Sequence, residues 1–181
     1  MFRSSRKLLA TLAFLAGACS APHREAHSPS ASNLPEYAGP ASAAFDDSIA
    51  PGTVEPSFLS ADTASRQALS KRTAEADTVA PVRVATASQV GASFDLTLEP
   101  VGAPIRGAAF TEAFTVSVSA RAPAYAFLES HRLQLLGTTV IIFLKAFNVE
   151  GSVETHFRIE PNSPSMRQAI ERAAALSEFG S

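Results

Sequence analysis

Residues 138–147, Thr-Thr-Val-Ile-Ile-Phe-Leu-Lys-Ala-Phe, form the most hydrophobic run of the chain beyond its first twenty residues. β-Branched and aromatic residues occupy both odd and even positions of this run, so both faces of a strand formed here would be apolar. Such a strand is typical of the centre of a sheet or barrel wall, where other elements cover both sides. We therefore expect the fold to be built around it.

A second strand is predicted directly after this run. Asn148 to Gly151 supply turn residues, and beyond them apolar and polar residues alternate with a period of two. The apolar set is Val153, Thr155, Phe157 and Ile159, and the polar set is Glu154, His156, Arg158 and Glu160. A short turn between two strands predicts an antiparallel hairpin.

The same period appears three times before the central run. Alternation over 82–89, 94–99 and 114–119 predicts three half-buried strands, with a turn near Gly91 and a turn-rich connector at 100–107. Residues 124–136 are apolar enough to belong to the core but follow neither the strand nor the helix period. We expect a turn or short helix with a loop there.

Two helices are expected. The stretch 64–76 contains good helix formers with Asp62 or Thr63 as a cap, and its thin apolar stripe indicates a surface helix with Arg72 exposed. Ser163 as cap and Pro164 at the first helical position predict a terminal helix that closes one side of the sheet. Its apolar stripe consists of Met166, Ala169, Ile170, Ala173 and Leu176, and Gly180 ends it.

These elements predict a mainly β (α+β) fold, namely a small five-stranded antiparallel barrel or curled sheet with a C-terminal helix and a surface helix before it. The order of elements over 79–159 resembles the small barrels of the OB type, including the netrin-like modules of secreted proteins. A two-layer α+β sheet is the alternative. A likeness of fold alone implies no function.

Composition excludes several classes of function. The 181 residues suit one ordinary domain. Three of the 15 Lys and Arg residues lie before residue 8, so the rest of the chain has 12 basic against 17 acidic residues, a net charge of −5. A nucleic-acid partner needs a basic face and is not expected. The single cysteine rules out an intramolecular disulfide or a thiolate metal cluster, and we expect no metal and no cofactor.

The first residues are typical of an export signal. Arg3, Arg6 and Lys7 precede an apolar segment over 8–15 and a small-residue run over 16–18. The apolar segment is well short of the about 20 residues that a membrane-spanning helix needs. Residues 1–18 are therefore predicted to be a signal peptide.

The residues around the only cysteine suggest how the signal ends. Leu15-Ala16-Gly17-Ala18-Cys19 resembles the lipobox of bacterial lipoproteins, with Ala16 where that family usually carries Leu. The resemblance implies a diacylglyceryl group on the Cys19 sulfur, cleavage before Cys19, acylation of the new amine, and membrane attachment through the lipid. The alternative is a plain secretory signal cut after Ala18. Ser20, where inner-membrane lipoproteins often carry Asp, suggests the periplasmic face of the outer membrane.

The chain between the cysteine and the domain is predicted to be a tether. Residues 19–44 are rich in Pro, Ser and Ala, and we place a single small β-rich domain at 45–181. An irregular lead-in over 45–59 carries the apolar anchors Phe45, Ile49, Val54, Phe58 and Leu59. Within it, Asp46 and Asp47 are interpreted as a solvated or helix-capping pair, because the ligand pattern of a calcium loop is missing.

One polar surface patch could carry chemistry. Alternate residues of a strand lie about 7 Å apart on one face, so Glu154, His156, Arg158 and Glu160 form a row that His131 and Arg132 could approach from the preceding segment. The sequence favours an ordinary solvated face, since alternating charges discourage edge pairing. The chain carries none of the standard hydrolase, metalloprotease or phosphate-loop motifs.

Three classes of function follow. We favour a lipid-anchored module of the cell envelope that is non-catalytic and binds an envelope protein or plays a structural part. The second is a small metal-dependent or hydrolytic periplasmic enzyme that uses His131, Glu154 and His156. The third is a carrier of an apolar ligand inside a barrel lined by four phenylalanines, which are Phe94, Phe114, Phe143 and Phe157.

Overall fold

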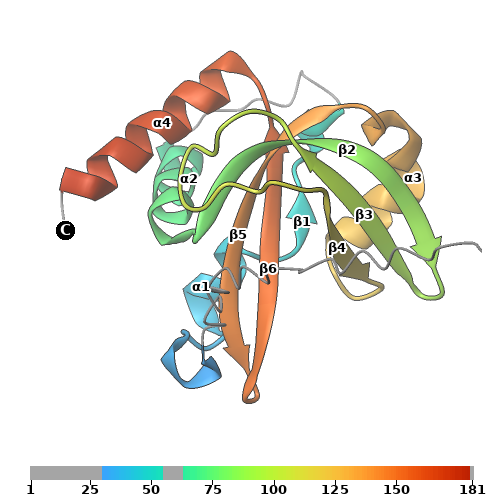
Figure 1. Ribbon diagram of the computed structural model, residues 1–181, viewed down its shortest axis with the longest axis horizontal. Helices are drawn as coiled ribbons and strands as arrows, with labels where there is room; N and C mark the ends of the chain where they lie inside the picture. The colour runs from blue at the N-terminus through green and yellow to red at the C-terminus, as the bar shows by residue number, and fades with distance from the viewer. Residues whose placement is uncertain (1–29, 55–62, 180–181) are drawn as a thin grey trace, which may run out of the picture.

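The computed structural model describes residues 30–54 and 63–179 and shows a mixed α+β fold around one sheet (Figure 1). The order of strands across the sheet is β1-β6-β5-β2-β3-β4. The β1–β6 pair is parallel, and every other pair is antiparallel. The strands are β1 Ser48–Ile49, β2 Thr78–Val90, β3 Ser93–Pro100, β4 Phe114–Ser119, β5 Thr139–Val149 and β6 Ser152–Pro161.

The predicted central strand and its hairpin are confirmed. Strand β5 lies between β6 and β2, and β5 pairs with β6 from Val140 opposite Pro161 to Val149 opposite Ser152. Ile141 and Phe143 are buried in the apolar cluster of one face, and Val140 and Ile142 in that of the other. A strand buried on both sides is what the continuous apolar run requires.

Four α-helices accompany the sheet in the part of the chain that the structure describes. They are α1 Gly39–Ala44, α2 Thr63–Glu75, α3 Ala124–Leu135 and α4 Pro164–Phe179, with single 3-10 turns at η1 Ala31–Asn33 and η2 Pro51–Thr53. The backbone N–H of Met166 donates to Ser163 Oγ at 3.1 Å, which confirms the predicted cap of α4. The segment expected to be a turn or short helix is the twelve-residue helix α3.

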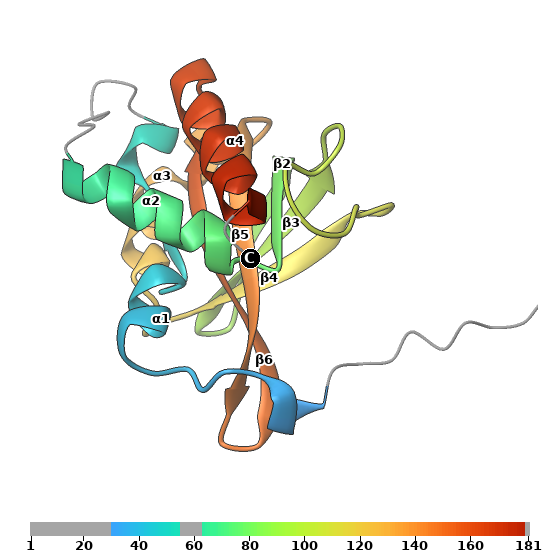
Figure 2. The same cartoon turned by 90° about the vertical axis from the view of Figure 1, so that its left-hand side faces the viewer.

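Helices cover both faces of the sheet. On one face, Ala124, Leu128 and Leu135 of α3 join the larger apolar cluster, which we call the α3 face. On the other, Leu69 of α2 and Ile170 of α4 join Phe143 and the rest of the second cluster, which we call the α2/α4 face. Figure 2 shows α2 and α4 side by side against the sheet.

The α+β class is confirmed, but the five-stranded barrel is not. The sheet has six strands and does not close, because β1 and β4 lie at opposite edges. The lead-in supplies β1, which occupies the outer side of β6 and ends the sheet there. The four phenylalanines expected to line a barrel are also divided, since Phe143 belongs to the α2/α4 face and Phe94, Phe114 and Phe157 to the α3 face.

The folded part begins before the expected boundary at residue 45. The backbone N–H of Tyr37 donates to the carbonyl of Asn148 at 3.2 Å, and the N–H of Asn148 donates to the carbonyl of Pro35 at 2.9 Å. The Tyr37 ring also packs edge-on against Phe147, with centroids 5.1 Å apart. Residues 35–44, which composition assigned to the tether, therefore belong to the domain.

Several predictions concern residues that the structure does not describe. The signal peptide over 1–18, Cys19, the tether up to residue 29, Phe58, Leu59 and Gly180 all lie outside the described residues. Within residues 30–54 and 63–179, none of the helices combines the length and apolar character needed to cross a membrane.

Candidate functional site

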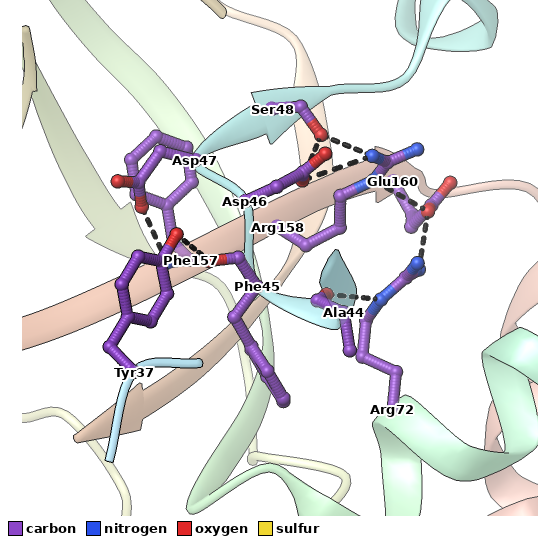
Figure 3. A network of polar contacts seen from close by, with 10 residues as sticks. All are labelled: Tyr37, Ala44, Phe45, Asp46, Asp47, Ser48, Arg72, Phe157, Arg158 and Glu160. Carbon is purple, nitrogen blue, oxygen red and sulfur yellow. Dashed lines mark hydrogen bonds and ion pairs between the residues drawn. The ribbon is translucent and has the colours of Figure 1, made fainter. Parts of the chain in front are cut away.

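Most of the polar row of β6 is covered: Glu154 is 52% exposed, but the other three members are not. The side chain of His156 is 12% exposed, that of Arg158 24% and that of Glu160 10%. The interpretation as an ordinary outer face therefore holds for Glu154 and is wrong for His156, Arg158 and Glu160. The lead-in, the segment around Tyr37 and helix α2 lie over this part of β6 and contribute the partners of the row (Figure 3).

Arg72 forms the innermost part of this polar cluster. Its Nη1 donates to Glu160 Oε1 at 2.7 Å and its Nε to the carbonyl of Ala44 at 2.8 Å, while its side chain is only 9% exposed. Burial lowers the pKa of Arg72, and the Glu160 carboxylate opposes that shift. The surface position predicted for Arg72 is wrong, because α2 turns this side chain toward the sheet.

Arg158 extends the cluster to the lead-in. Its Nε donates to Glu160 Oε1 at 3.2 Å, and its Nη1 contacts Asp46 Oδ1 at 3.2 Å and the hydroxyl of Ser48. The Ser48 hydroxyl in turn donates to Asp46. Two arginines thus share one glutamate, and Asp46 is a partner of Arg158 rather than a solvated or capping residue.

Asp47 fastens the lead-in to β6. Its backbone has a φ of 52°, a left-handed conformation that Asp tolerates better than most residues. Its carboxylate accepts hydrogen bonds from the backbone N–H of Phe157 at 2.9 Å and from His156 Nδ1 at 2.8 Å. Asp47 is therefore a structural hydrogen-bond acceptor, and neither of the roles considered from the sequence describes it.

Tyr37 covers His156. The two rings stack with centroids 3.6 Å apart and an angle of 5° between their planes, and the Tyr37 hydroxyl donates to the carbonyl of Phe45 at 3.1 Å. Burial, with the nearby charges of Asp47 and Asp46, raises the pKa of Tyr37. His156 Nε2 is buried without a hydrogen-bond partner in the structure and lies 3.8 Å from Glu154 Oε2. A nitrogen in that position is enclosed by the protein and does not face a substrate.

His131 is not brought to this cluster. It lies on α3, its Nδ1 is 3.2 Å from the carbonyl of Phe127, and its ring stacks on the Phe127 ring. Helix α3 packs on one face of the sheet and His156 lies on the other, so His131, Glu154 and His156 do not form one site. Among the residues that the structure describes, no three His, Cys, Asp or Glu side chains are placed to hold a metal ion.

An open cleft of about 570 Å³ adjoins the polar cluster. Its polar part contains Arg72, Arg158 and Glu160 together with Ser65, Arg66 and Ser165. Leu69 of α2 and Met166 of α4 contribute to its apolar walls. The cleft is bounded by η2, α2, α4 and the end of β6. It combines apolar surface with fixed polar groups, which is the usual make-up of a binding site.

Sequence reasoning missed this cleft because its lining comes from segments far apart in the chain. One signal for its polar part was present. Leu69, Arg72, Thr73 and Ala76 recur at helical spacing, and all four are buried. A charged residue within a buried helical stripe needs a buried partner, which here is Glu160.

No protein-family model matches the chain, and comparisons with curated proteins and with solved structures found no significant similarity.

Proposed function

We propose that this protein is a lipid-anchored lipoprotein of the cell envelope, attached through Cys19, whose domain acts as a non-catalytic binding module outside the cytoplasm. The observation that carries the binding role is the cleft between α2, α4 and the end of β6, with Arg72, Arg158 and Glu160 in its polar part. The lipobox-like residues 15–19 support the anchor, and Ser20 favours the periplasmic face of the outer membrane.

The cleft is suited to binding because its polar groups are held in place before a partner arrives. Arg72 is fixed by Glu160 and the Ala44 carbonyl, and Arg158 by Glu160 and Asp46. Side chains that are already ordered lose little entropy on association. The described lining combines these charged groups with apolar residues such as Leu69 and Met166, and this combination favours an envelope protein that presents a polar group between apolar residues.

The contacts of the two histidines support a non-catalytic role over the enzymatic alternative. The hydrolytic or metal-dependent reading required His131, Glu154 and His156 in one place, and the sheet separates His131 from the other two. The free nitrogen of His156 is buried under Tyr37. A general base needs access to the proton that it abstracts.

The anchor is tested by the mass of the processed protein. We expect a chain that begins at Cys19 with thioether-linked diacylglycerol and remains in the membrane fraction. Cys19→Ser abolishes this modification, whereas Ser20→Ala, one residue away, leaves it in place. A chain that keeps its leader, or that starts at Cys19 with an unmodified thiol, would contradict the anchor.

The binding role is tested by filling the cleft. Ala68 lines the cleft and is exposed on α2, so Ala68→Trp places a large ring in it. Ala74 is exposed on the same helix outside the cleft, and Ala74→Trp is the matched control. We expect an envelope protein to be captured by the wild type and by Ala74→Trp but not by Ala68→Trp. Equal capture by the two variants would show that the cleft is not the binding surface.

A further inference from the structure

The two edge strands of the sheet differ in length and in composition. The β1 edge is two residues long, with Asp46 and Asp47 before it and Pro51 after it. The β4 edge is six residues long, Phe-Thr-Val-Ser-Val-Ser over 114–119, and contains no charge, proline or glycine. Short strands, charges and prolines are the usual means by which an edge avoids pairing with another chain. Strand β4 has none of them.

The outer side of β4 is open in the part of the chain that the structure describes. The strand pairs with β3 from Phe114 opposite Leu98 to Ser119 opposite Ser93. Beyond this ladder, the backbone hydrogen bonds of the described residues include a single one at β4, from the N–H of Ala122 to the carbonyl of Ser119. The backbone donors and acceptors of residues 115–118 that face away from β3 therefore remain available to a further strand.

The charges that flank β4 favour a second copy of this chain as the partner. Glu112 precedes the strand, Arg121 follows it, both are exposed, and neither forms an ion pair with another described residue. If a second β4 pairs in the antiparallel direction, Glu112 of each copy comes near Arg121 of the other, twice by symmetry. Parallel pairing would instead bring like charges together, which is unfavourable.

The pleat of β4 restricts the register of such a pair. Thr115, Ser117 and Ser119 point to the polar side of the strand, while Val116 and Val118 pack toward the α3 face. Directly opposite residues in an antiparallel pair share a face. One residue of β4 must therefore lie opposite its own copy, at the two-fold axis that relates the two chains. In the centre of the strand, this residue is Val116 or Ser117.

We propose that two copies of this chain associate through their β4 edges as an antiparallel pair, so that one sheet runs through both. The symmetry is closed, because each copy offers the same edge to the other. The partner surface is β4 itself with Glu112 and Arg121. The association does not depend on the cleft or on what the cleft binds.

Cysteine cross-linking of the processed, membrane-bound chain tests this directly. Ser117→Cys gives a disulfide-linked dimer if the axis passes through Ser117, and the double variant Thr115→Cys/Ser117→Cys also links if it passes through Val116. Ser93→Cys, a serine on the neighbouring inner strand β3, is the matched control and stays monomeric. The wild type, which has Cys19 alone, sets the background. Absence of a dimer in both test variants, or cross-linking only to a different protein, overturns the proposal.

Charge reversal supplies a second test that does not depend on the introduced cysteine being well tolerated. Glu112→Arg and Arg121→Glu, each added to the cross-linking variant, should reduce the dimer fraction several-fold. The two reversals together should restore it, because the opposite charges meet again. The same charge variants made without the introduced cysteine should show this pattern relative to the wild type by sedimentation in detergent. Failure of the double reversal to restore the dimer overturns the antiparallel arrangement.

Discussion

The contacts on the two faces of the sheet differ in kind. On the α3 face, β5 and β6 contribute Val140, Ile142, Phe157 and Ile159 to a cluster of apolar side chains. On the α2/α4 face, the same strands contribute Phe143 and Ile141 together with the ion-paired Glu160 and Arg158. Apolar packing is non-directional, whereas a buried ion pair is stable only when every partner is in place.

This difference explains what each face does in the fold. The apolar face gains free energy in proportion to the surface that it buries and can accept a lost methyl group at moderate cost. The polar cluster joins α2, the lead-in and β6 through Arg72, Asp46 and Glu160, which are far apart in the sequence. The geometry of these hydrogen bonds fixes the positions of the three segments relative to one another. It thereby also fixes the shape of the cleft beside them.

The largest effect is expected from removing one partner of the buried ion pair. Arg72→Met keeps most of the side-chain volume but leaves Glu160 without its shortest ionic contact. Breaking a buried pair in this way usually costs about 3–5 kcal/mol. We expect the free energy of unfolding, measured by urea denaturation, to fall by no more than that amount, because Arg158 still donates to Glu160.

The matched control removes both charges. In Arg72→Met/Glu160→Leu, no carboxylate is left buried opposite an apolar side chain, and Arg158 keeps Asp46 as a partner. We expect this double variant to be more stable than Arg72→Met alone. A double variant as unstable as the single one would show that packing, and not the unpaired charge, accounts for the loss.

A smaller effect is expected on the apolar face. Ile142 is fully buried, and Ile142→Val removes one methyl group, which usually costs about 0.5–1.5 kcal/mol. Leu133→Ala is the exposed control, because Leu133 is 75% exposed and should change stability by less than about 0.5 kcal/mol. Urea denaturation that ranks these two substitutions in the opposite order would contradict the assignment of Ile142 to the core.

The smallest effect is expected at Tyr37 and appears only at high pH. Its pKa in the folded state lies above the usual value of 10.0, so the folded protein holds the phenolic proton more tightly than the unfolded chain does. This contribution is complete below pH 10 and is lost as the pH rises through the folded pKa. Tyr37→Phe should therefore lose less stability than the wild type between pH 9 and pH 11, and parallel losses would contradict the shift.

Much of the sheet could be predicted from the sequence because it depends on local patterns. Alternation between Val82 and Gln89, and between Val153 and Glu160, marks strands whose two sides meet different surroundings. The continuous apolar run at 138–147 marks a strand covered on both sides. Ser163 and Pro164 mark the start of α4 through contacts made within one turn of the helix.

The remaining features depend on tertiary contacts that local patterns do not contain. Strand β1 is too short to show a period, and it forms because Asp47 accepts the Phe157 N–H. The sequence predicts only a turn or short helix where α3 lies, because apolar residues such as Tyr125, Leu133 and Leu136 surround its buried stripe and obscure the helical period. In the sequence, Asp46 and Asp47 do not differ from a solvated acidic pair. Only the structure shows Arg158 next to Asp46 and His156 next to Asp47.

The attachment of residues 35–37 to the end of the β5–β6 hairpin has a mechanical consequence. The backbone hydrogen bonds between Tyr37, Asn148 and Pro35 are the first backbone hydrogen bonds to the sheet that are met when the described chain is followed from its N-terminal side. Tension that reaches the domain from that side acts on these bonds one at a time, in a peeling direction. The contact of the Ala44 carbonyl with Arg72 and those of Asp47 with Phe157 and His156 lie further along the chain, so tension reaches the edge of the sheet only after the contacts at the hairpin tip have opened.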